Sequence, residues 1–378
     1  QSLNALVQMH RLSNNRFLFE VFTTHPNNLV LLSRLGIEAT AVRISVFDSF
    51  LHRLSNNSLW QSLQTRLKLV GSLEKRLLLH GCDLVYFVTP SNLPFALQTL
   101  NYVTTLWDLC HRESPEFPEV RRFNMFSMRD NGNRNRLGPA LLTLTESQRL
   151  ADIASRCYGV EHERFLAMPL SPSPFLQPMH AVKAEDVLIK YSLDAGYYFY
   201  PAQFWAHKNH IRILQALVIL RDKFSRKPYV VFSGKDYGNL GHIQGFISSN
   251  MLDSQVKILG FVPFEDMRGL FENATAVVMP TYFGPTNMPP LEAWSLGIPL
   301  IYSSHLVEQA GNAALLVDPD SAEELATAMR QCSDAKVRDK LIEAGHQRLA
   351  EISRQRTSAE EKLCIELDKY SIRRMCWP

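Results

Sequence analysis

The sequence has little excess charge, no closely spaced cysteines and no long apolar run. Its 40 basic and 37 acidic residues leave a net charge of +3, so we expect no nucleic-acid partner. The six cysteines are all at least twelve positions apart, which excludes a zinc ribbon or a dense disulfide framework and predicts reduced thiols in a cytoplasmic protein. No run of about eighteen apolar residues predicts a membrane-spanning helix. No G-x-G-x-x-G motif follows a predicted strand, which argues against an α/β dehydrogenase.

What remains is the composition of a folded globular protein. Hydrophobic residues make up 46% of the 378 positions and charged residues 20%, with a mean hydropathy of −0.11. Because domains average about 150 residues, the length predicts two sizeable domains or one large barrel. Sixteen of the eighteen basic residues before Met179 are arginine. This excess favours a phosphate-bearing or membrane-surface partner, although an ordinary solvated face explains it equally well.

Apolar runs alternate with helical patterns through both halves of the chain, and this alternation predicts an α/β fold with doubly wound parallel sheets. In the first half we expect strands at 17–22, 39–46, 84–88, 103–106 and 141–145, helices at 3–10, 30–35, 66–79 and 147–157, and irregular polar chain at 108–136. The proline-rich run Ser171–Pro174 is the expected linker. In the second half we expect strands at 197–200, 229–232, 256–259, 276–279 and 299–302, and helices at 209–224, 264–273, 289–296 and from 322 to about 370.

The segment from Met279 to Pro299 carries the most chemical information. A buried strand leads into a loop with Gly284, Thr286 and Asn287, and a helix starts near Pro289. Unpaired N–H groups at a helix N-terminus, where the helix dipole is positive, attract a phosphate. Glu292, one turn further on, is placed to accept hydrogen bonds from a ribose diol. The alternative is an ordinary strand–loop–helix junction with a solvated glutamate.

This segment resembles the signature of glycosyltransferase family 4, whose members are retaining enzymes with the GT-B fold. Glu292 matches the second glutamate of the family's E-G-F-G-x-P-x-L-E pattern, which holds the nucleotide ribose. Gly284 stands in the position of the first glutamate, which contacts the donor sugar. The loop 283–288 is similar to a variant in bacterial polysaccharide enzymes, which implies that Thr286, Asn287, Met288 and loop amides take over that contact.

The resemblance continues upstream, over about residues 75–345. In the run 199–210, Lys208 matches the family's phosphate-binding lysine and Gln203 replaces its usual arginine. A lysine there counters the charge that develops on a diphosphate leaving group. The resemblance also implies that Gly234 and Lys235 lie near the donor and that Phe261 contacts the nucleobase. A solvated lysine and a core phenylalanine are the alternatives for Lys208 and Phe261.

In the first half, residues 106–117 are similar to the family's H-D-L-x-H stretch, with Trp107 in place of the first histidine. Asp108 and His111 align with the family's residues that position hydroxyl groups of donor or acceptor. A histidine with a pKa near neutrality also suits proton transfer. The alternative for His111 is a structural loop histidine. The turn 145–147 matches more weakly.

The resemblance implies a GT-B fold of two Rossmann-like domains facing each other across a cleft. The expected boundaries are 1–175 for the acceptor-binding domain, 176–355 for the nucleotide-sugar domain and 356–378 for a C-terminal helix that crosses back to the first domain. The implied function is retaining transfer of mannose or a similar hexose from a GDP- or UDP-linked donor to a glycan or lipid-linked acceptor in surface-polysaccharide synthesis, such as O-antigen.

The implied enzyme needs neither cofactor nor metal, and we expect no Asp-x-Asp motif at the end of a strand. It would act in the cytoplasm, at the inner face of the plasma membrane, in contact with the membrane or with other polysaccharide-assembly proteins. Because Gly284, Gln203 and Trp107 depart from the family pattern, a non-catalytic nucleotide-sugar or glycan-binding module stays open as the alternative. A GT-B epimerase or phosphorylase is a lesser one.

Overall fold

The computed structural model describes residues 2–12, 17–45, 66–67, 70–178 and 181–377. Their contacts divide the chain into two compact units. Unit 1 comprises the described residues of Gln1–Leu109, Ser127–Pro169 and Arg356–Pro378, and unit 2 comprises Cys110–Phe126 and Leu170–Gln355. None of the helices described is long and apolar enough to span a bilayer.

Unit 2 is built around one six-stranded sheet in which every pair of neighbours is parallel. The spatial order is β12-β11-β10-β7-β8-β9. Central strands are apolar throughout because helices cover both faces, as expected for a parallel sheet. The strands are β7 (Tyr197–Pro201), β8 (Val230–Ser233), β9 (Val256–Ile258), β10 (Ala274–Met279), β11 (Leu300–Ser303) and β12 (Leu315–Val317).

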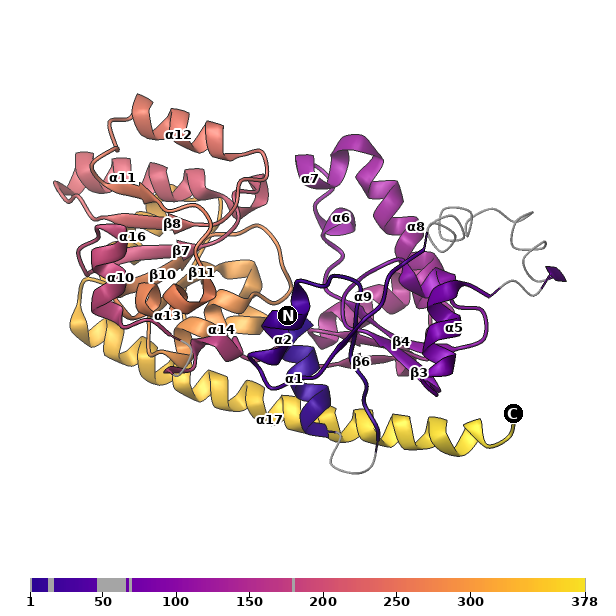
Figure 1. Cartoon of the computed structure of the whole chain (residues 1–378). Coiled ribbons are helices and arrows are strands. Elements are labelled where there is room, and N and C mark those ends of the chain that lie inside the picture. The colour runs from indigo at the N-terminus through magenta and orange to yellow at the C-terminus, as the bar shows by residue number, and fades with distance from the viewer. Residues whose placement is uncertain (1, 13–16, 46–65, 68–69, 179–180, 378) are drawn as a thin grey trace. The chain divides into compact units, whose positions relative to one another are not determined.

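Helices pack on the two faces of this sheet in separate groups. Figure 1 shows α11, α12 and α16 on one face and α10, α13 and α14 on the other, and the largest helix–helix contacts pair α11 with α16 and α10 with α13. The helices are α10 (Ala184–Tyr191), α11 (His210–Phe224), α12 (Leu240–Ser249), α13 (Phe264–Glu272), α14 (Met288–Ser295), α15 (Val307–Ala310) and α16 (Ala322–Gln331).

The chain order reverses between β7 and β10. From β7 the chain proceeds to β8 and β9 on one side, and from β10 to β11 and β12 on the other. The loops after β7 and β10 therefore lead to helices on opposite faces, and ligands of open α/β sheets bind at such a switch point, beyond the carboxyl ends of the strands. A ligand site in unit 2 is therefore expected beyond the carboxyl ends of β7 and β10.

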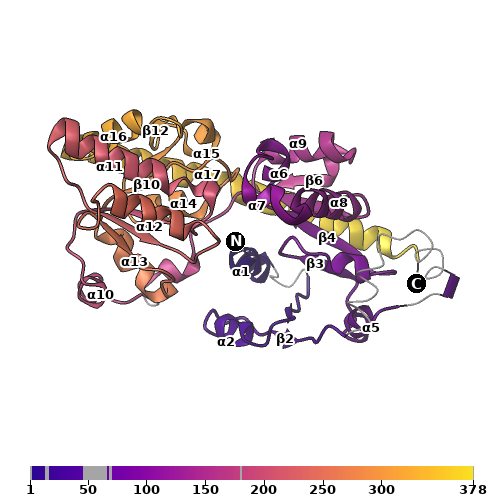
Figure 2. The ribbon, with the colours of Figure 1, turned by 90° about the horizontal axis from the view of Figure 1, so that it is seen from above.

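Unit 1 holds a four-stranded parallel sheet in the simple order β3-β4-β5-β6. Figure 2 shows α9 beside β6, and residues of both lie in one apolar cluster. The strands are β3 (Leu84–Phe87), β4 (Asn101–Leu106), β5 (Leu142–Thr145) and β6 (Phe165–Ala167), with a separate parallel pair β1 (Phe22–Thr23) and β2 (Thr40–Ala41). The helices are α1 (Ser2–Leu12), α2 (Asn28–Ser33), α5 (Ser72–Leu79), α8 (Met125–Leu137) and α9 (Gln148–Tyr158).

The last helix, α17 (Ala335–Arg374), contributes residues to both units. Before the division at Arg356, the Arg348 side chain donates to the carbonyl of Gln309 in unit 2 at 2.9 Å. After it, the Tyr370 hydroxyl donates to the carbonyl of Asp83 in unit 1 at 2.8 Å. The domain boundaries drawn from the sequence stay a prediction.

The α/β class with parallel sheets is confirmed, but several expected elements differ. The stretch 108–136 is wrong as irregular chain, because it contains α6 (Cys110–Glu113), α7 (Pro118–Arg121) and most of α8. Helix α8 lacks apolar periodicity because it buries Asn133 and Arg136 beside Leu137. The strands expected at 17–22 and 39–46 shrink to two residues each, although Val46 lies outside the described residues. Strands β6 and β12 have only three residues each, too few for a periodic signal.

Candidate active site

Lys208 ends the 3₁₀ turn Ala206–Lys208, directly after the carboxyl end of β7. Its ammonium group donates to Oδ1 of Asn287, in the loop after β10, at 3.3 Å. The Tyr200 hydroxyl fixes the backbone by donating to the Lys208 carbonyl at 2.8 Å. Lys208 therefore lies at the switch point of the sheet and is half-buried there.

The loop 283–288 is held mainly through the side chain of Asn287. Its amide group donates to the Gly284 carbonyl at 3.0 Å and to the Tyr302 hydroxyl at 2.7 Å. Gln309 accepts from the Asn287 N–H at 2.9 Å and donates to the Asn287 carbonyl at 2.7 Å. Gly284 has φ +117°, and a β-carbon there would lie 2.8 Å from Oδ1 of Asn287. The glutamate of the family pattern has no room in this conformation.

The start of α14 offers fewer main-chain donors than the sequence suggests. The four N–H groups that a helix leaves without an intrahelical partner here belong to residues 287–290. Pro289 and Pro290 have no N–H, and the N–H of Asn287 donates to Gln309. The expected group of unpaired donors is therefore wrong, although the helix dipole still favours an anion at this end. Thr286 and Met288 are half-buried beside it.

Glu292 lies in the second turn of α14, close to its N-terminal end. The residue is half-buried rather than fully exposed, and burial raises the pKa of its carboxyl to about 7. Its carboxylate makes no hydrogen bond to any other residue that the structure describes. Asn287, which accepts from Lys208, is the N-cap of the same helix and stands five positions before Glu292.

The loops after β8 and β9 contribute the other three predicted donor-binding residues. Gly234 approaches the chain after β7 so closely that a β-carbon would lie 2.3 Å from the Ala202 carbonyl oxygen. The Gln203 side chain accepts from the Lys235 N–H at 2.5 Å. The Lys235 ammonium lies 4.9 Å from the ring centre of Phe261, which is 59% exposed. Phe261 is therefore not a core residue, and its ring face is open to contact.

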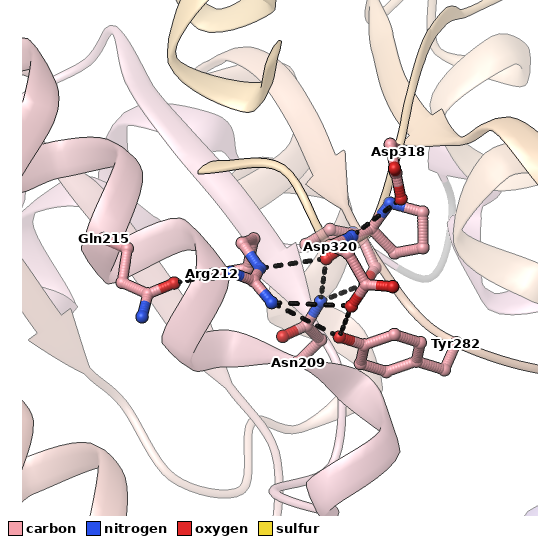
Figure 3. Close-up of polar contacts among 8 residues, drawn as sticks. Asn209, Arg212, Gln215, Tyr282, Asp318 and Asp320 are labelled. Atoms are coloured by element: carbon pink, nitrogen blue, oxygen red, sulfur yellow. Dashed lines mark hydrogen bonds and ion pairs between the residues drawn. The ribbon is translucent and has the colours of Figure 1, made fainter. Parts of the chain in front are cut away.

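Asn209, the residue after Lys208, belongs to a brace of polar contacts that Figure 3 shows. Asn209 adopts φ +58° and donates to the carbonyls of Pro280 at 3.0 Å and Pro319 at 2.8 Å. Arg212 donates to the same Pro319 carbonyl at 3.0 Å and forms an ion pair with Asp320 at 3.6 Å. Tyr282 donates to Asp320 at 2.6 Å. The brace joins the segments after β7, β10 and β12.

The brace also corrects the expectation that no Asp-x-Asp motif follows a strand. Asp318-Pro-Asp320 comes directly after β12, a strand too short to be predicted. Asp318 accepts from the Asp320 N–H at 2.9 Å, and Asp320 accepts from Tyr282, so both carboxylates hold the loop. Over the described part of the chain, no group of three or more His, Cys, Asp or Glu side chains is placed to hold a metal ion.

The two residues predicted from the first half belong to different units. Asp108 lies in unit 1 and accepts a hydrogen bond from Arg129. His111 lies in α6 of unit 2, where it is fully buried and its ring packs edge-on against Phe126 at 5.5 Å. In the weaker 145–147 turn, the Ser147 hydroxyl caps α9 by accepting from the Leu150 N–H at 3.2 Å. Ser147 is therefore the N-cap of α9.

A buried pair that no sequence pattern predicts lies beside Lys208. The Glu119 carboxylate accepts hydrogen bonds from the His207 N–H at 3.0 Å and from Nδ1 of the same residue. Both side chains are about nine-tenths buried. His207 stands in the run that carries Lys208, but Glu119 lies 88 positions away, and no local pattern links them.

Comparison with known proteins identifies the family of the region that contains Lys208 and Glu292. Residues 197–334 match the family model described as glycosyl transferases group 1. The chain is 27% identical over 254 residues to the O-antigen chain mannosyltransferase B of Escherichia coli, covering 66% of this chain and 65% of that protein. It is 24% identical over 189 residues to the O-antigen chain mannosyltransferase RfbU of Salmonella typhimurium, covering 50% and 49%. The chain thus spans about two thirds and one half of the lengths of these two relatives.

The fold agrees with solved structures along nearly the whole chain. The structure of Anabaena Alr3699/HepE in complex with UDP and glucose superposes with a TM-score of 0.69 at 16% identity, covering 98% of this chain and 96% of that one. At this identity the likeness establishes the fold, which is the GT-B fold. Residues 197–334 are therefore similar to the group 1 glycosyl transferases, and the chain has the GT-B fold.

Proposed function

We propose that this chain is a retaining glycosyltransferase that moves mannose or a similar hexose from a nucleotide-diphosphate donor to a glycan or lipid-linked acceptor. Unit 2 binds the donor, and unit 1, with Asp108, binds the acceptor. The reaction belongs to surface-polysaccharide synthesis, in keeping with the two O-antigen mannosyltransferases to which the chain is similar. It takes place in the cytoplasm, at the inner face of the plasma membrane.

The hydrogen bond between Lys208 and Asn287 carries this proposal. It sets a cation half-buried at the switch point of a parallel sheet, beside the positive end of α14. A diphosphate bound there gains from both charges, and Lys208 counters the negative charge that grows as the glycosidic bond breaks. Glu292 accepts hydrogen bonds from the ribose hydroxyls, and the exposed face of Phe261 contacts the nucleobase.

The chemistry at the sugar follows from what the loop lacks. Gly284 leaves no carboxylate beside the donor sugar in the loop after β10, which argues against a covalent glycosyl intermediate. We therefore assign front-face transfer. The bond from C1 to the diphosphate oxygen breaks, the acceptor hydroxyl oxygen bonds to C1 on the same face, and its proton passes to the departing phosphate. No metal is required, since Lys208 supplies the positive charge.

Turnover by the purified chain tests the proposal. GDP-mannose, UDP-glucose and related donors are offered in EDTA with a lipid-linked glycan acceptor, and the anomeric configuration of the product is read by NMR. Replacing Lys208 by alanine should lower kcat by about 10²- to 10³-fold, the usual cost of losing a group that stabilises transition-state charge. The matched control is Lys223→Ala, an exposed lysine at the far end of α11, which should leave turnover unchanged.

The same assay separates the alternatives. A product of inverted configuration would dismiss front-face transfer, and turnover that disappears in EDTA would dismiss the metal-free assignment. A chain that binds nucleotide sugars through Lys208 but neither transfers nor hydrolyses them would be the non-catalytic binding module. Gly284 and Gln203 motivate that second candidate, because they replace a glutamate and an arginine of the family pattern.

A further inference from the structure

A segment distant in sequence packs against the turn that carries Lys208. We call residues 110–126, which contain α6 and α7, the docked segment, because their contacts place them in unit 2 while the chain on both sides of them belongs to unit 1. The ring of Phe117 lies 5.2 Å from that of Tyr282 and 5.4 Å from that of Phe283. The docked segment is thus anchored on the loop that follows β10.

Its most specific contact is a pair of hydrogen bonds from His207 to Glu119. One carboxylate oxygen accepts from both the main-chain N–H and the ring Nδ1 of His207. Burial alone would raise the pKa of Glu119, but the hydrogen bonds from His207 lower it below its usual value, so the carboxylate stays ionised. A charged acceptor with only 8% of its side chain exposed fixes the position of its donors more firmly than a surface contact does.

His207 in turn joins the turn after β7 to the loop after β10. Its ring stacks on Phe283, with ring centres 3.8 Å apart and planes 14° from parallel. Its carbonyl accepts from the Tyr282 N–H at 2.9 Å. Lys208 follows His207 in the segment after β7, and Gly284 follows Phe283 in the loop after β10. Any shift of His207 is therefore passed to both sides of the Lys208–Asn287 contact.

We infer that Glu119 is a positioning residue for Lys208, acting through His207 from the docked segment. This inference rests on the proposed function, in which Lys208 stabilises the departing diphosphate. Glu119 holds the backbone and the ring of His207, the residue before Lys208. The turn that carries Lys208 is therefore fixed on both sides. Loss of this restraint lets the ammonium group move, and a displacement of about 1 Å at a catalytic group costs up to ~10²-fold in rate.

A double-mutant cycle on kcat distinguishes positioning from a general structural role. Glu119→Ala should lower kcat by about 10- to 100-fold with a smaller change in KM for the donor. In a Lys208→Ala background, the same substitution should change kcat by less than about twofold, because the group that it positions is already gone. Equal effects of Glu119→Ala in the two backgrounds would overturn the inference.

Two substitutions at His207 separate the hydrogen bond from the ring stack. His207→Asn keeps a side-chain donor near the Nδ1 position and removes the stack on Phe283. His207→Phe keeps the stack and removes the donor. If Glu119 positions the turn through its hydrogen bonds, the asparagine variant retains more activity than the phenylalanine variant. The opposite ranking would contradict the inference.

Controls keep the test decisive. Glu119→Gln retains an oxygen acceptor and can be measured even if the alanine variant does not fold. Its kcat should lie between those of wild type and Glu119→Ala. Asp152→Asn alters an exposed pair in unit 1, in which Nε2 of His162 lies 2.7 Å from Asp152, and should leave kcat unchanged. Wild-type turnover in Lys208→Ala would overturn the proposed function of Lys208. A Lys208→Ala variant slowed by about 10²- to 10³-fold, in which Glu119→Ala has the same effect as in wild type, would overturn the role of Glu119 alone.

Discussion

The ammonium group of Lys208 donates to the side-chain oxygen of Asn287 at 3.3 Å, across the point where the strand order of unit 2 reverses. Lys208 follows β7 and Asn287 follows β10, and these adjacent strands send their next helices to opposite faces of the sheet. Loops that diverge in this way leave space beyond the strand ends. The hydrogen bond thus marks the place where a ligand of unit 2 is expected, beside a positive charge that attracts an anion.

Gly284 is the residue on which the shape of this loop depends most directly. Its φ of +117° strains any residue with a side chain, and a β-carbon would lie 2.8 Å from the oxygen of Asn287 that accepts from Lys208. We predict that Gly284→Ala lowers the free energy of unfolding by about 1–3 kcal/mol and also reduces donor binding, since Asn287 must move. Urea unfolding and calorimetric titration with the nucleotide measure the two effects.

The matched control for this substitution is Gly245→Ala in α12. Gly245 has ordinary helical geometry and open space where a β-carbon would be placed. Because alanine is the better helix former, this variant should gain about 0.5–1 kcal/mol and bind the nucleotide as wild type does. A Gly284→Ala variant that bound the nucleotide normally would show that the loop conformation does not govern the site.

The sequence predicted unit 2 better than unit 1 for a physical reason. Strands such as 197–201 and 274–279 are covered on both faces, so they appear as apolar runs ended by proline or glycine. Lys208, Asn287 and Glu292 follow two of these strands and could be found from local order alone. In unit 1, β1 and β2 have two residues each, and α8 buries polar side chains. Neither the strand period of two residues nor the helix period of 3.6 residues is therefore visible in the sequence.

Contacts between distant segments were beyond sequence reasoning. Glu119 meets His207 across 88 positions, and Asp320 joins the brace only because β12 places it beside Tyr282. The helix was predicted to start near Pro289 and starts at Met288. Its N–H groups were expected to be unpaired, which is wrong for Asn287, because the bond from Asn287 to Gln309 depends on tertiary packing. Local patterns therefore located the site, and the packing decides which of its groups remain available.

Glu292 predicts a pH dependence of donor binding. Burial raises the pKa of its carboxyl to about 7, so the ionised fraction increases as the pH rises through that value. A carboxylate is a stronger acceptor for ribose hydroxyls than the neutral acid. We therefore expect KM for the donor to fall between pH 6 and pH 8 and then to level off. Initial rates over a series of donor concentrations at each pH measure this profile.

Glu292→Gln should remove the profile and leave KM at pH 8 raised by about 10- to 100-fold, as expected for losing hydrogen bonds to a charged group. The control is Glu323→Gln, an exposed glutamate in the first turn of α16, which should keep the wild-type profile. An unchanged pH profile in the Glu292→Gln variant would remove this carboxyl from the donor site.

His210, the first residue of α11, predicts a pH dependence of stability. It is fully buried among the rings of Tyr200, Phe204 and Phe232, at 4.7 to 5.0 Å between ring centres. Burial, together with the nearby charge of Lys208, lowers the pKa of its imidazole to about 3. In the unfolded chain the pKa is near 6.5, so below that pH the unfolded state binds a proton that the folded state excludes.

The sign follows from this difference. The contribution of His210 to stability is fully present above pH 6.5 and is lost progressively as the pH falls toward 3, by about 2 kcal/mol between pH 7 and pH 5. His210→Phe and His210→Leu both remove the titration, and any repacking cost that they carry is the same at both pH values. The stability advantage of wild type over each variant should therefore shrink by about 2 kcal/mol from pH 7 to pH 5 in urea unfolding.

His242→Ala, at an exposed position of α12, should show no such change, because its side chain stays hydrated in the folded protein. An equal advantage at both pH values would mean that the folded protein accommodates the protonated imidazole at His210, and the aromatic enclosure would then not exclude charge.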